Sequence, residues 1–185
     1  MKRCQWAGKD PLMIIYHDQE WGVAVNDDHN WFEFIVLESF QAGLSWKTIL
    51  HKREGFRSAF FDFDVKKVSE MEESKMLELM VDKSIIRNKL KIRSTVSNAI
   101  AFIEIQKEFN SFNEYIWSFV NNKTIKNSFK KMSDIPAKTD LSDKISGDLK
   151  KRGFKFMGST ICYAMLQAAG IVNDHTTDCF RYNQI

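Results

Sequence analysis

The sequence predicts an all-α fold, and three observations support that prediction. Only two prolines interrupt its 185 residues, and proline is the residue that most often breaks a helix. Between them, apolar residues recur mostly at the spacing of one helix face. Runs that alternate like a strand and end in hairpin turns are scarce, and the best of them, residues 60–63, is ambiguous.

The composition is that of an ordinary globular protein. Hydrophobic residues make up 44% of the chain and charged residues 28%, which argues against disorder, collagen and coiled coils. A chain of this length buries roughly 70% of its unfolded surface, and the sequence contains no linker, repeat or low-complexity segment. We therefore expect a single domain over residues 1–185, with two helical subdomains flanking a cleft as the alternative.

Helix boundaries are visible along the first half of the chain. Gly43 follows an apolar helical stretch and is expected to end it in a left-handed conformation. Ser45 is expected to cap the next helix, and Gly55 to end another. Ser69, with a glutamate three residues later, fits the Ser-x-x-Glu capping box and predicts a further helix start.

Two more helices are predicted in the middle of the chain. Apolar residues at i, i+4, i+7, i+8 and i+11 form one helix face; they are Ile92, Val96, Ala99, Ile100 and Ile103. Ser111 fits a second capping box. The same apolar spacing follows it, at Phe112, Ile116, Phe119 and Val120.

The last third begins with a predicted surface connection. Lys123–Lys131 is basic and polar, and the helical pattern resumes around Leu141. A subdomain boundary at this connection fits the pattern. Gly153 separates two helical stretches, and Gly170 is expected to end the second.

Charge and hydropathy restrict the class of protein. The net charge of +3 is compatible with one locally basic face but does not by itself indicate a nucleic-acid partner. Met1–Gln5 lacks the apolar stretch of a signal peptide, and no run of ~18 apolar residues is present. We therefore expect a soluble, cytoplasmic protein.

The cysteines and histidines form a candidate metal site. Three cysteines are an odd number, so in a reducing compartment we expect free thiols or metal ligands. Cys4 and His17 lie near one end of the chain, and His175 and Cys179 near the other. Such a Cys₂His₂ set fits tetrahedral zinc and leaves no position for a reactive water. Spacing alone leaves open that the four are unrelated, while Cys162 fits a small buried hydrophobe.

Glu38 lies in an otherwise apolar helical stretch and is a candidate site residue. The ordinary interpretation is a solvent-facing or ion-paired side chain, because charges are rarely buried unpaired. The alternative is a carboxylate in an aromatic pocket, although each aromatic alone fits a core position; the candidates are Trp6, Tyr16, Trp21 and Trp46. Two rings that sandwich a planar ligand, with Glu38 at its edge, suit a cationic nucleobase.

Two glycine-containing turns are candidates for DNA contact. Leu44, in a turn between helices, suits an apolar wedge inserted into a base step, with an ordinary helix-helix turn as the alternative. Lys150–Thr160 carries four cations and two glycines between helical stretches. Backbone amides at such a turn approach phosphates closely, which predicts a helix-hairpin-helix motif. A solvated basic turn is the alternative there.

Five segments, taken in order, resemble one known family. They are Tyr16–Gly22, Leu37–Glu38, Gln41–Trp46, Arg152–Gly158 and Thr160–His175. Together they resemble the Tag-type family, DNA-3-methyladenine glycosylase I. The resemblance runs from Cys4 to Cys179, nearly the whole chain, and several motifs in the same order are more specific than any one of them.

The resemblance implies the α-helical helix-hairpin-helix DNA glycosylase fold. It implies a monofunctional enzyme, with no lyase step, that excises 3-methyladenine from alkylated double-stranded DNA. It also implies one structural Zn²⁺ per chain, joining the N- and C-terminal segments through Cys4, His17, His175 and Cys179. A monomer is expected, because one active site serves one lesion.

The resemblance also maps the base pocket onto this chain. The pocket residues are Tyr16, Trp46, Trp6 and Glu38, and Glu38 is the candidate catalytic residue that reads the edge of the flipped base. The expected DNA contacts come from the two turns; they are Gly43, Leu44, Gly153, Lys155, Gly158 and Ser159.

The expected mechanism relies on a weak bond. Related helix-hairpin-helix glycosylases carry a catalytic Asp beyond the hairpin, which the Tag-type family lacks in its usual place, and the resemblance gives Asp174 and Asp178 no such role. Alkylation makes adenine a cationic leaving group, so binding and orientation supply much of the acceleration.

Two other classes stay open at this point. A zinc-stabilised DNA-binding module without catalysis would have no use for Glu38. A zinc hydrolase would need an open metal position, and the His-Glu-x-x-His motif is absent.

Overall fold

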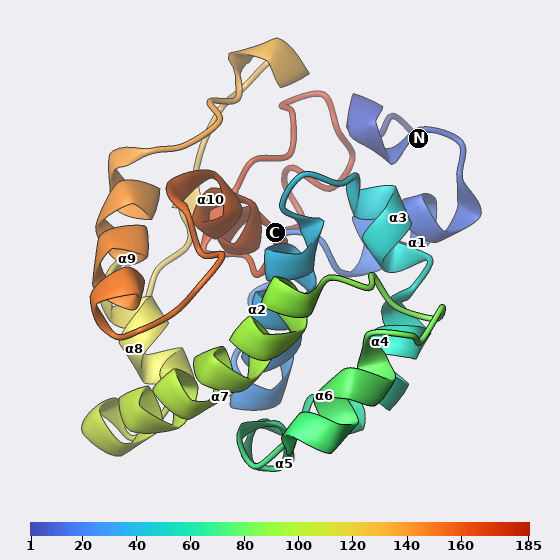
Figure 1. Cartoon of the computed structure of the whole chain (residues 1–185). Coiled ribbons are helices and arrows are strands. Elements are labelled where there is room, and N and C mark those ends of the chain that lie inside the picture. Colours follow the sequence, from blue (N-terminus) through green and yellow to red (C-terminus); the bar gives the residue numbers. More distant parts are fainter.

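The computed structural model describes residues 1–185 and is built mainly from helices (Figure 1). Its α-helices are α1 (Pro11–Gln19), α2 (Asp28–Gln41), α3 (Trp46–Leu50), α4 (Arg53–Ala59), α5 (Val65–Ser69), α6 (Glu73–Leu79), α7 (Lys89–Phe109), α8 (Phe112–Ser118), α9 (Asp140–Lys151) and α10 (Ser159–Ala168). Its 3-10 turns are η1 (Gln5–Ala7), η2 (Phe61–Phe63) and η3 (Met132–Asp134). None of the helices has both the length and the apolar character needed to cross a membrane.

Helix α2 forms the centre of the core. Asp27 caps its first turn by accepting a hydrogen bond from the Asn30 amide, and every residue from Trp31 to Phe40 is buried. Helices α3, α7, α8 and α10 pack against it, and α7 crosses in front of it in Figure 1. Because neighbours enclose this helix on several sides, its polar residues are buried too, Glu38 among them.

Helix α7 confirms the predicted helix but not the predicted face. Ile92 and Ala99 are fully buried, whereas Ile100 is 51% exposed. The buried stripe runs instead through Phe102 and Ile105, because α7 packs against α2, α5 and α8 at once. The spacing identified the helix, and tertiary packing decided which side faces inward.

The predicted caps are confirmed at two of three serines. Ser45 and Ser111 each accept a hydrogen bond from the amide three residues later. The prediction at Ser69 is wrong, because this residue ends α5 and its hydroxyl donates to the Lys66 carbonyl. A serine hydroxyl serves the backbone in either position. Helix α6 begins after Glu72 instead.

The predicted helix ends are confirmed at three glycines. Gly43, Gly153 and Gly170 follow α2, α9 and α10 with φ of +80°, +98° and +73°. The prediction at Gly55 is wrong, because Gly55 lies inside α4. A Cβ there would lie 2.4 Å from the carbonyl oxygen of Ser84, so the glycine permits a close approach of two segments and ends no helix.

One short strand pair interrupts the helical fold. β1 (Ile125–Lys126), within the predicted surface connection, pairs in parallel with β2 (Val172–Asn173). Residues 60–63 lie at η2 and not in a strand. Nearby, the amide of Phe180 donates to the carbonyl of Lys2 at 3.0 Å. The C-terminal segment is therefore held against both the connection and the N-terminal segment.

Candidate functional site

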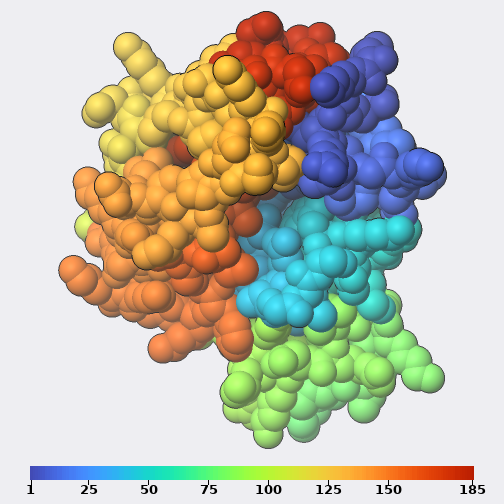
Figure 2. Space-filling view, turned by 90° about the horizontal axis from the view of Figure 1, so that it is seen from above, coloured from blue at the N-terminus to red at the C-terminus, as the bar shows by residue number.

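A cavity of about 750 Å³ lies between the N-terminal segment, α2, α3 and α10. Figure 2 shows a hollow where the N-terminal residues (blue) face the segment around residues 130–140 (light orange). The cavity wall includes Trp6, Tyr16, Glu38, Gln41, Trp46, Tyr163 and Gln167. The structure thus brings the four pocket residues expected from the sequence to one cavity.

Glu38 lines this cavity from α2. Its side chain is 2% exposed, and its Oε2 atom has no hydrogen-bond partner. Burial raises the pKa of Glu38 to about 8, because the charged form loses its contact with water. Glu33 on the same helix is also buried, but it pairs with Arg53 and Arg57 at 2.9 and 3.1 Å. The ion-pair interpretation therefore applies to Glu33 and not to Glu38.

Three further buried polar atoms in the cavity wall lack a hydrogen-bond partner. They are Nε1 of Trp6, Nε1 of Trp46 and Oε1 of Gln41. With Oε2 of Glu38 they amount to two donors and two acceptors in one wall, although buried polar groups are rarely left unpaired. The wall thus suits a ligand with both donors and acceptors on its edge. The sequence did not predict a role for Gln41, which lies three residues after Glu38 on the same helix and so on a neighbouring part of its surface.

Aromatic rings form a continuous part of the wall. The ring centroids of Tyr16 and Trp46 lie 5.1 Å apart with 41° between the ring planes, and the centroid of Trp6 lies 6.1 Å from that of Tyr16. Trp21 packs edge-on against Trp6 at 5.0 Å. A base between two rings separates them by about twice the 3.4 Å stacking distance. The sandwich suggested by the sequence therefore does not fit Tyr16 and Trp46 as they stand, and a base can lie between these two rings only if one of them moves.

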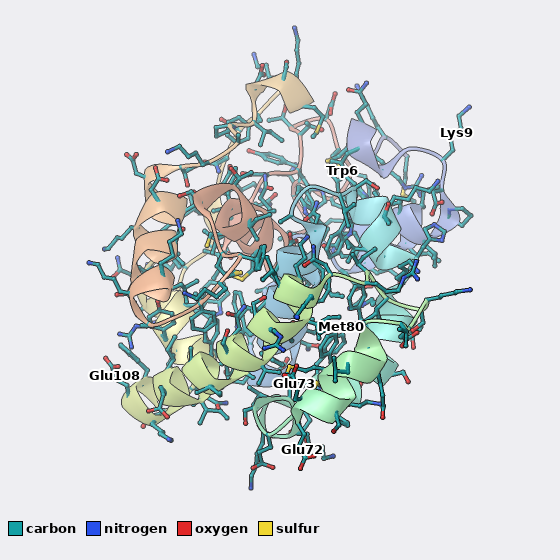
Figure 3. All side chains as sticks on the ribbon, viewed as in Figure 1. Trp6, Lys9, Glu72, Glu73, Met80 and Glu108 are labelled. Carbon is teal, nitrogen blue, oxygen red and sulfur yellow. The ribbon has the colours of Figure 1, made fainter.

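The rim of the cavity is charged. Lys9 extends from it into solvent in Figure 3. The Asp10 carboxylate caps α1 and also bonds Nζ of Lys47 and Nε2 of His51, both at 2.9 Å. These partners hold the pKa of Asp10 well below its usual range. Asp10 and Glu38 are the acidic residues of the wall, and of the two, Glu38 has the unpartnered oxygen.

Helix α10 supplies another part of the wall, anchored on one carboxylate. The Tyr163 hydroxyl donates to Asp174 at 2.5 Å, and Nε2 of Gln167 donates to the same carboxylate at 2.8 Å. Nδ2 of Asn127 donates to it at 2.7 Å. Asp174 is buried, so these bonds hold two cavity residues in place. The sequence carried no signal for the full arrangement, because Asn127 comes from a distant segment.

The four predicted metal ligands meet in one buried cluster, and their ligand atoms lie within 4.8 Å of one another. Sγ of Cys179 lies 3.4 Å from both Nε2 of His17 and Nδ1 of His175. Sγ of Cys4 lies 3.5 Å from the same Nδ1 atom. Zinc bonds of about 2.0–2.3 Å in a tetrahedron place ligand atoms about 3.3–3.8 Å apart. The spacing of the cluster fits that ion.

Contacts outside the cluster fix which nitrogen of each imidazole faces it. Nδ1 of His17 lies 2.8 Å from Oδ1 of Asp18, and Nε2 of His175 donates to the Trp21 carbonyl at 3.1 Å. Metal-bound histidines usually have such a partner on the outer nitrogen. Burial lowers the pKa of His175 to about 4, which keeps its ring neutral, as a ligand must be. The residues present therefore fit a closed Cys₂His₂ site.

The expected DNA-contact residues lie on two turns. Gly43 and Leu44 follow α2, and the Leu44 side chain is 41% exposed. The hairpin between α9 and α10 carries Gly153, Lys155, Gly158 and Ser159. Of the four cations expected near this hairpin, Arg152 pairs with Glu108 and Asp148. The other three are lysines exposed at the surface.

Comparisons with known proteins agree over nearly the whole chain. Residues 6–182 match the family model described as methyladenine glycosylase. The chain is 47% identical to DNA-3-methyladenine glycosylase 1 of Escherichia coli, covering 98% of this chain and 97% of that protein. It is 45% identical to DNA-3-methyladenine glycosylase of Haemophilus influenzae, covering 96% of each.

Solved structures give the same result. A crystal structure of 3-methyladenine DNA glycosylase I is similar with a TM-score of 0.94 and 45% identity, over 97% of this chain and 98% of that one. The Staphylococcus aureus enzyme, solved to explain 3-methyladenine recognition, is similar with a TM-score of 0.94 and 36% identity, over 97% and 96% of the two chains.

Proposed function

Because the chain belongs to the methyladenine glycosylase family, and is thus an enzyme that hydrolyses N-glycosyl bonds, we propose that it excises 3-methyladenine from alkylated double-stranded DNA. In this proposal the damaged base leaves the stack and enters the cavity beside Glu38, water cleaves the bond, and no lyase step follows. The relatives that match are named for the same base.

The observation that carries the proposal is the set of unpartnered atoms in the wall. Adenine offers an amino group as donor and ring nitrogens as acceptors. The carboxylate of Glu38 and the amide oxygen of Gln41 suit the amino group, and the indole N–H of Trp6 suits an acceptor. Alkylation adds positive charge, which a buried carboxylate attracts strongly. Normal adenine lacks this charge, and its stronger glycosidic bond needs assistance that the site does not offer.

The base stacks against the aromatic wall after Trp46 moves. Trp46 begins the five-residue helix α3 next to the exposed Leu44 turn and is only half-buried, whereas Tyr16 is buried in α1. The Trp46 ring is therefore the one free to swing aside and close over the base. Movement of an aromatic ring onto a bound base also provides stacking energy.

Catalysis in this proposal rests on binding and orientation. Asp10 is engaged by Lys47 and His51, so Glu38 is the carboxylate in the wall with an oxygen free to act. A bound cation favours the ionised form of Glu38, which burial alone disfavours. The negative charge then stabilises the cationic base in the pocket and the positive charge that develops on the sugar as the bond breaks. A cationic leaving group departs without a second acid, so one carboxylate is sufficient.

The Cys/His cluster would hold one Zn²⁺ with a structural role. Its four ligands are Cys4, His17, His175 and Cys179, which fill a tetrahedron and leave no position for a reactive water. The metal, when bound, supplies a cross-link between the N- and C-terminal segments. This closed ligand set argues against a zinc hydrolase.

DNA contacts in this proposal come from the two turns. Gly153, Lys155, Gly158 and Ser159 form the hairpin of a helix-hairpin-helix motif whose amides and lysine bind phosphates. Leu44 enters the base stack beside the lesion, as apolar wedges do in kinked duplexes. One chain with one cavity is sufficient for one lesion, so the enzyme acts as a monomer.

The test is detection of free bases released from methylated duplex DNA by liquid chromatography and mass spectrometry. The wild type is expected to release 3-methyladenine and little 7-methylguanine, and Glu38→Ala and Trp46→Ala are expected to release less while they keep their fold and zinc. A folded, zinc-loaded wild type that releases no base would overturn the proposal and leave a DNA-binding module. Equal release by Glu38→Ala would remove Glu38 from the mechanism.

A further inference from the structure

A buried lysine on α7 holds the C-terminal end of α2. Lys91 is 5% exposed, and its Nζ atom donates to the carbonyl oxygens of Phe40 and Ala42 at 2.8 and 2.6 Å. The last carbonyls of a helix have no partner within the helix, so a side chain that binds them stabilises its end. No acidic side chain bonds to Lys91, which leaves these two carbonyls as its polar contacts.

The turn that Lys91 holds has little other support. Gly43 follows Ala42 with φ of +80°, and a Cβ placed on Gly43 would meet nothing within 4 Å. The Leu44 side chain beyond it is 41% exposed. One internal hydrogen bond, from the Leu44 amide to the Gln41 carbonyl, closes the turn. Lys91 therefore supplies side-chain hydrogen bonds that join this turn to α7.

The same face of α7 also holds the second turn. Asn98 lies two helical turns after Lys91, is fully buried, and bonds both the amide and the carbonyl of Lys155, at 2.8 and 3.1 Å. Lys91 also approaches this hairpin, because its ammonium lies 5.8 Å from the ring centroid of Phe156. One rigid helix thus fixes the Leu44 turn and the hairpin relative to each other.

The positive charge of Lys91 also changes the electrostatics at the C-terminal end of α2. The C-terminal end of a helix carries about half a negative charge, and α2 ends at the turn that carries Leu44. A DNA backbone that approaches this turn meets the negative end of α2. The ammonium of Lys91, bonded to those carbonyls, offsets that charge where the phosphates must come close.

We propose that Lys91 is a positioning residue for the insertion of Leu44 into duplex DNA. It keeps the turn rigid against the base stack and keeps it at a fixed distance from the phosphate-binding hairpin. The inference rests on the proposed function, because it concerns how the same enzyme opens its duplex. Lys91 touches neither the base nor the sugar, so the rate on DNA that is already unstacked does not depend on it.

The experiment compares Lys91→Met with Lys89→Met, which removes an exposed lysine from the first turn of the same helix and is matched in charge. Single-turnover release of 3-methyladenine is measured on methylated duplex and on the same DNA after strand separation. Binding of free 3-methyladenine is followed by tryptophan fluorescence. Loss of charge-assisted hydrogen bonds predicts about a tenfold or greater fall on duplex for Lys91→Met, with single-strand release and base binding unchanged. Lys89→Met is expected to match the wild type in release from duplex, in release from single strands and in binding of the free base.

A fall of equal size on duplex and on single strands, or Lys91→Met behaving like Lys89→Met, would overturn the inference. In a Leu44→Ala background, Lys91→Met is expected to cause no further loss on duplex, and a full additional loss would also contradict it. If Lys91→Met does not fold, Lys91→Gln keeps one donor and is expected to show a smaller loss confined to duplex. A wild type inactive on both substrates would instead overturn the proposed function.

Discussion

The hydroxyl of Tyr163 donates to the carboxylate of Asp174 at 2.5 Å, and this bond connects the cavity wall to the segment that carries the metal ligands. Asp174 directly precedes His175 and is buried beside it. The cavity and the Cys/His cluster therefore share a support. A substitution that disturbs the cavity wall at Tyr163 is therefore expected to affect the Cys/His cluster, and the reverse.

Substitution of Asp174 tests that connection. Asp174→Ala leaves three donors without their acceptor, from Tyr163, Gln167 and Asn127, and each buried unpaired group costs about 1–3 kcal/mol. We expect a lower free energy of unfolding and slower release of 3-methyladenine, whereas Asp174→Asn retains part of both. Denaturant titration and single-turnover kinetics measure the two effects. Glu78→Ala, at an exposed ion pair with Lys75, is the control and should change neither.

Removal of the metal is expected to loosen the chain ends before the core. Purified protein should contain one zinc per chain, and chelation should lower the free energy of unfolding by several kcal/mol, because a metal that binds only the folded state stabilises it. Metal analysis and thermal unfolding measure this. Cys179→Ser should lose the zinc, and Cys162→Ala, at a buried thiol outside the cluster, should keep it. Full stability of zinc-free wild type would contradict the assignment.

The raised pKa of Glu38 predicts a pH-dependent stability. In the folded protein its pKa is about 8, and in the unfolded chain it returns to about 4.3. Between these values the folded state binds a proton that the unfolded state does not, so the free energy of unfolding falls as pH rises from about 4.5 to 8. Urea titrations across this range measure the slope. Glu38→Gln should flatten the slope. Glu104→Gln, at an exposed glutamate, should leave the slope as in the wild type. Equal slopes in all three proteins would show that burial does not raise the pKa of Glu38.

Two cations of the hairpin region should differ in their effect on DNA binding. Lys155 is exposed and contacts one phosphate in the proposed complex, so Lys155→Ala should reduce the slope of log K against log salt by about 0.9. Arg152 pairs with Glu108 and Asp148, so Arg152→Ala should lower stability and leave that slope unchanged. Fluorescence anisotropy with labelled duplex at several salt concentrations measures both. A smaller slope of log K against log salt in Arg152→Ala would show that Arg152 contacts a phosphate and would contradict this prediction.

Local signals in the sequence predicted several helix boundaries, and the resemblance to a known family supplied the residues of the candidate site. Ser45, Gly43 and Gly170 act within a few residues of themselves, and the structure confirms all three. Gly55 was misread because its neighbour, Ser84, is distant in sequence. A glycine that permits a close approach looks the same in sequence as one that ends a helix.

The roles of Gln41, Asp174 and Lys91 could not be predicted from the sequence, because each depends on contacts that form only in the folded protein. Gln41 becomes important only because its amide oxygen is buried without a partner. Asp174 accepts from two residues of α10 and from the distant Asn127, and Lys91 donates to carbonyls about 50 residues earlier in the chain. No spacing or periodicity reports such partners, because they exist only after the chain has folded.

Non-covalent contacts join the two terminal segments, so the folded chain is closed on itself although its backbone is linear. The Lys2–Phe180 hydrogen bond, the Cys/His cluster and the pairing of β1 with β2 all join the C-terminal segment to earlier parts of the fold. A single cut in the exposed connection at residues 127–131 would leave both pieces attached through these contacts. Force applied at the two ends would act first on the Lys2–Phe180 hydrogen bond and then on the cluster, before it reached the helices around the cavity.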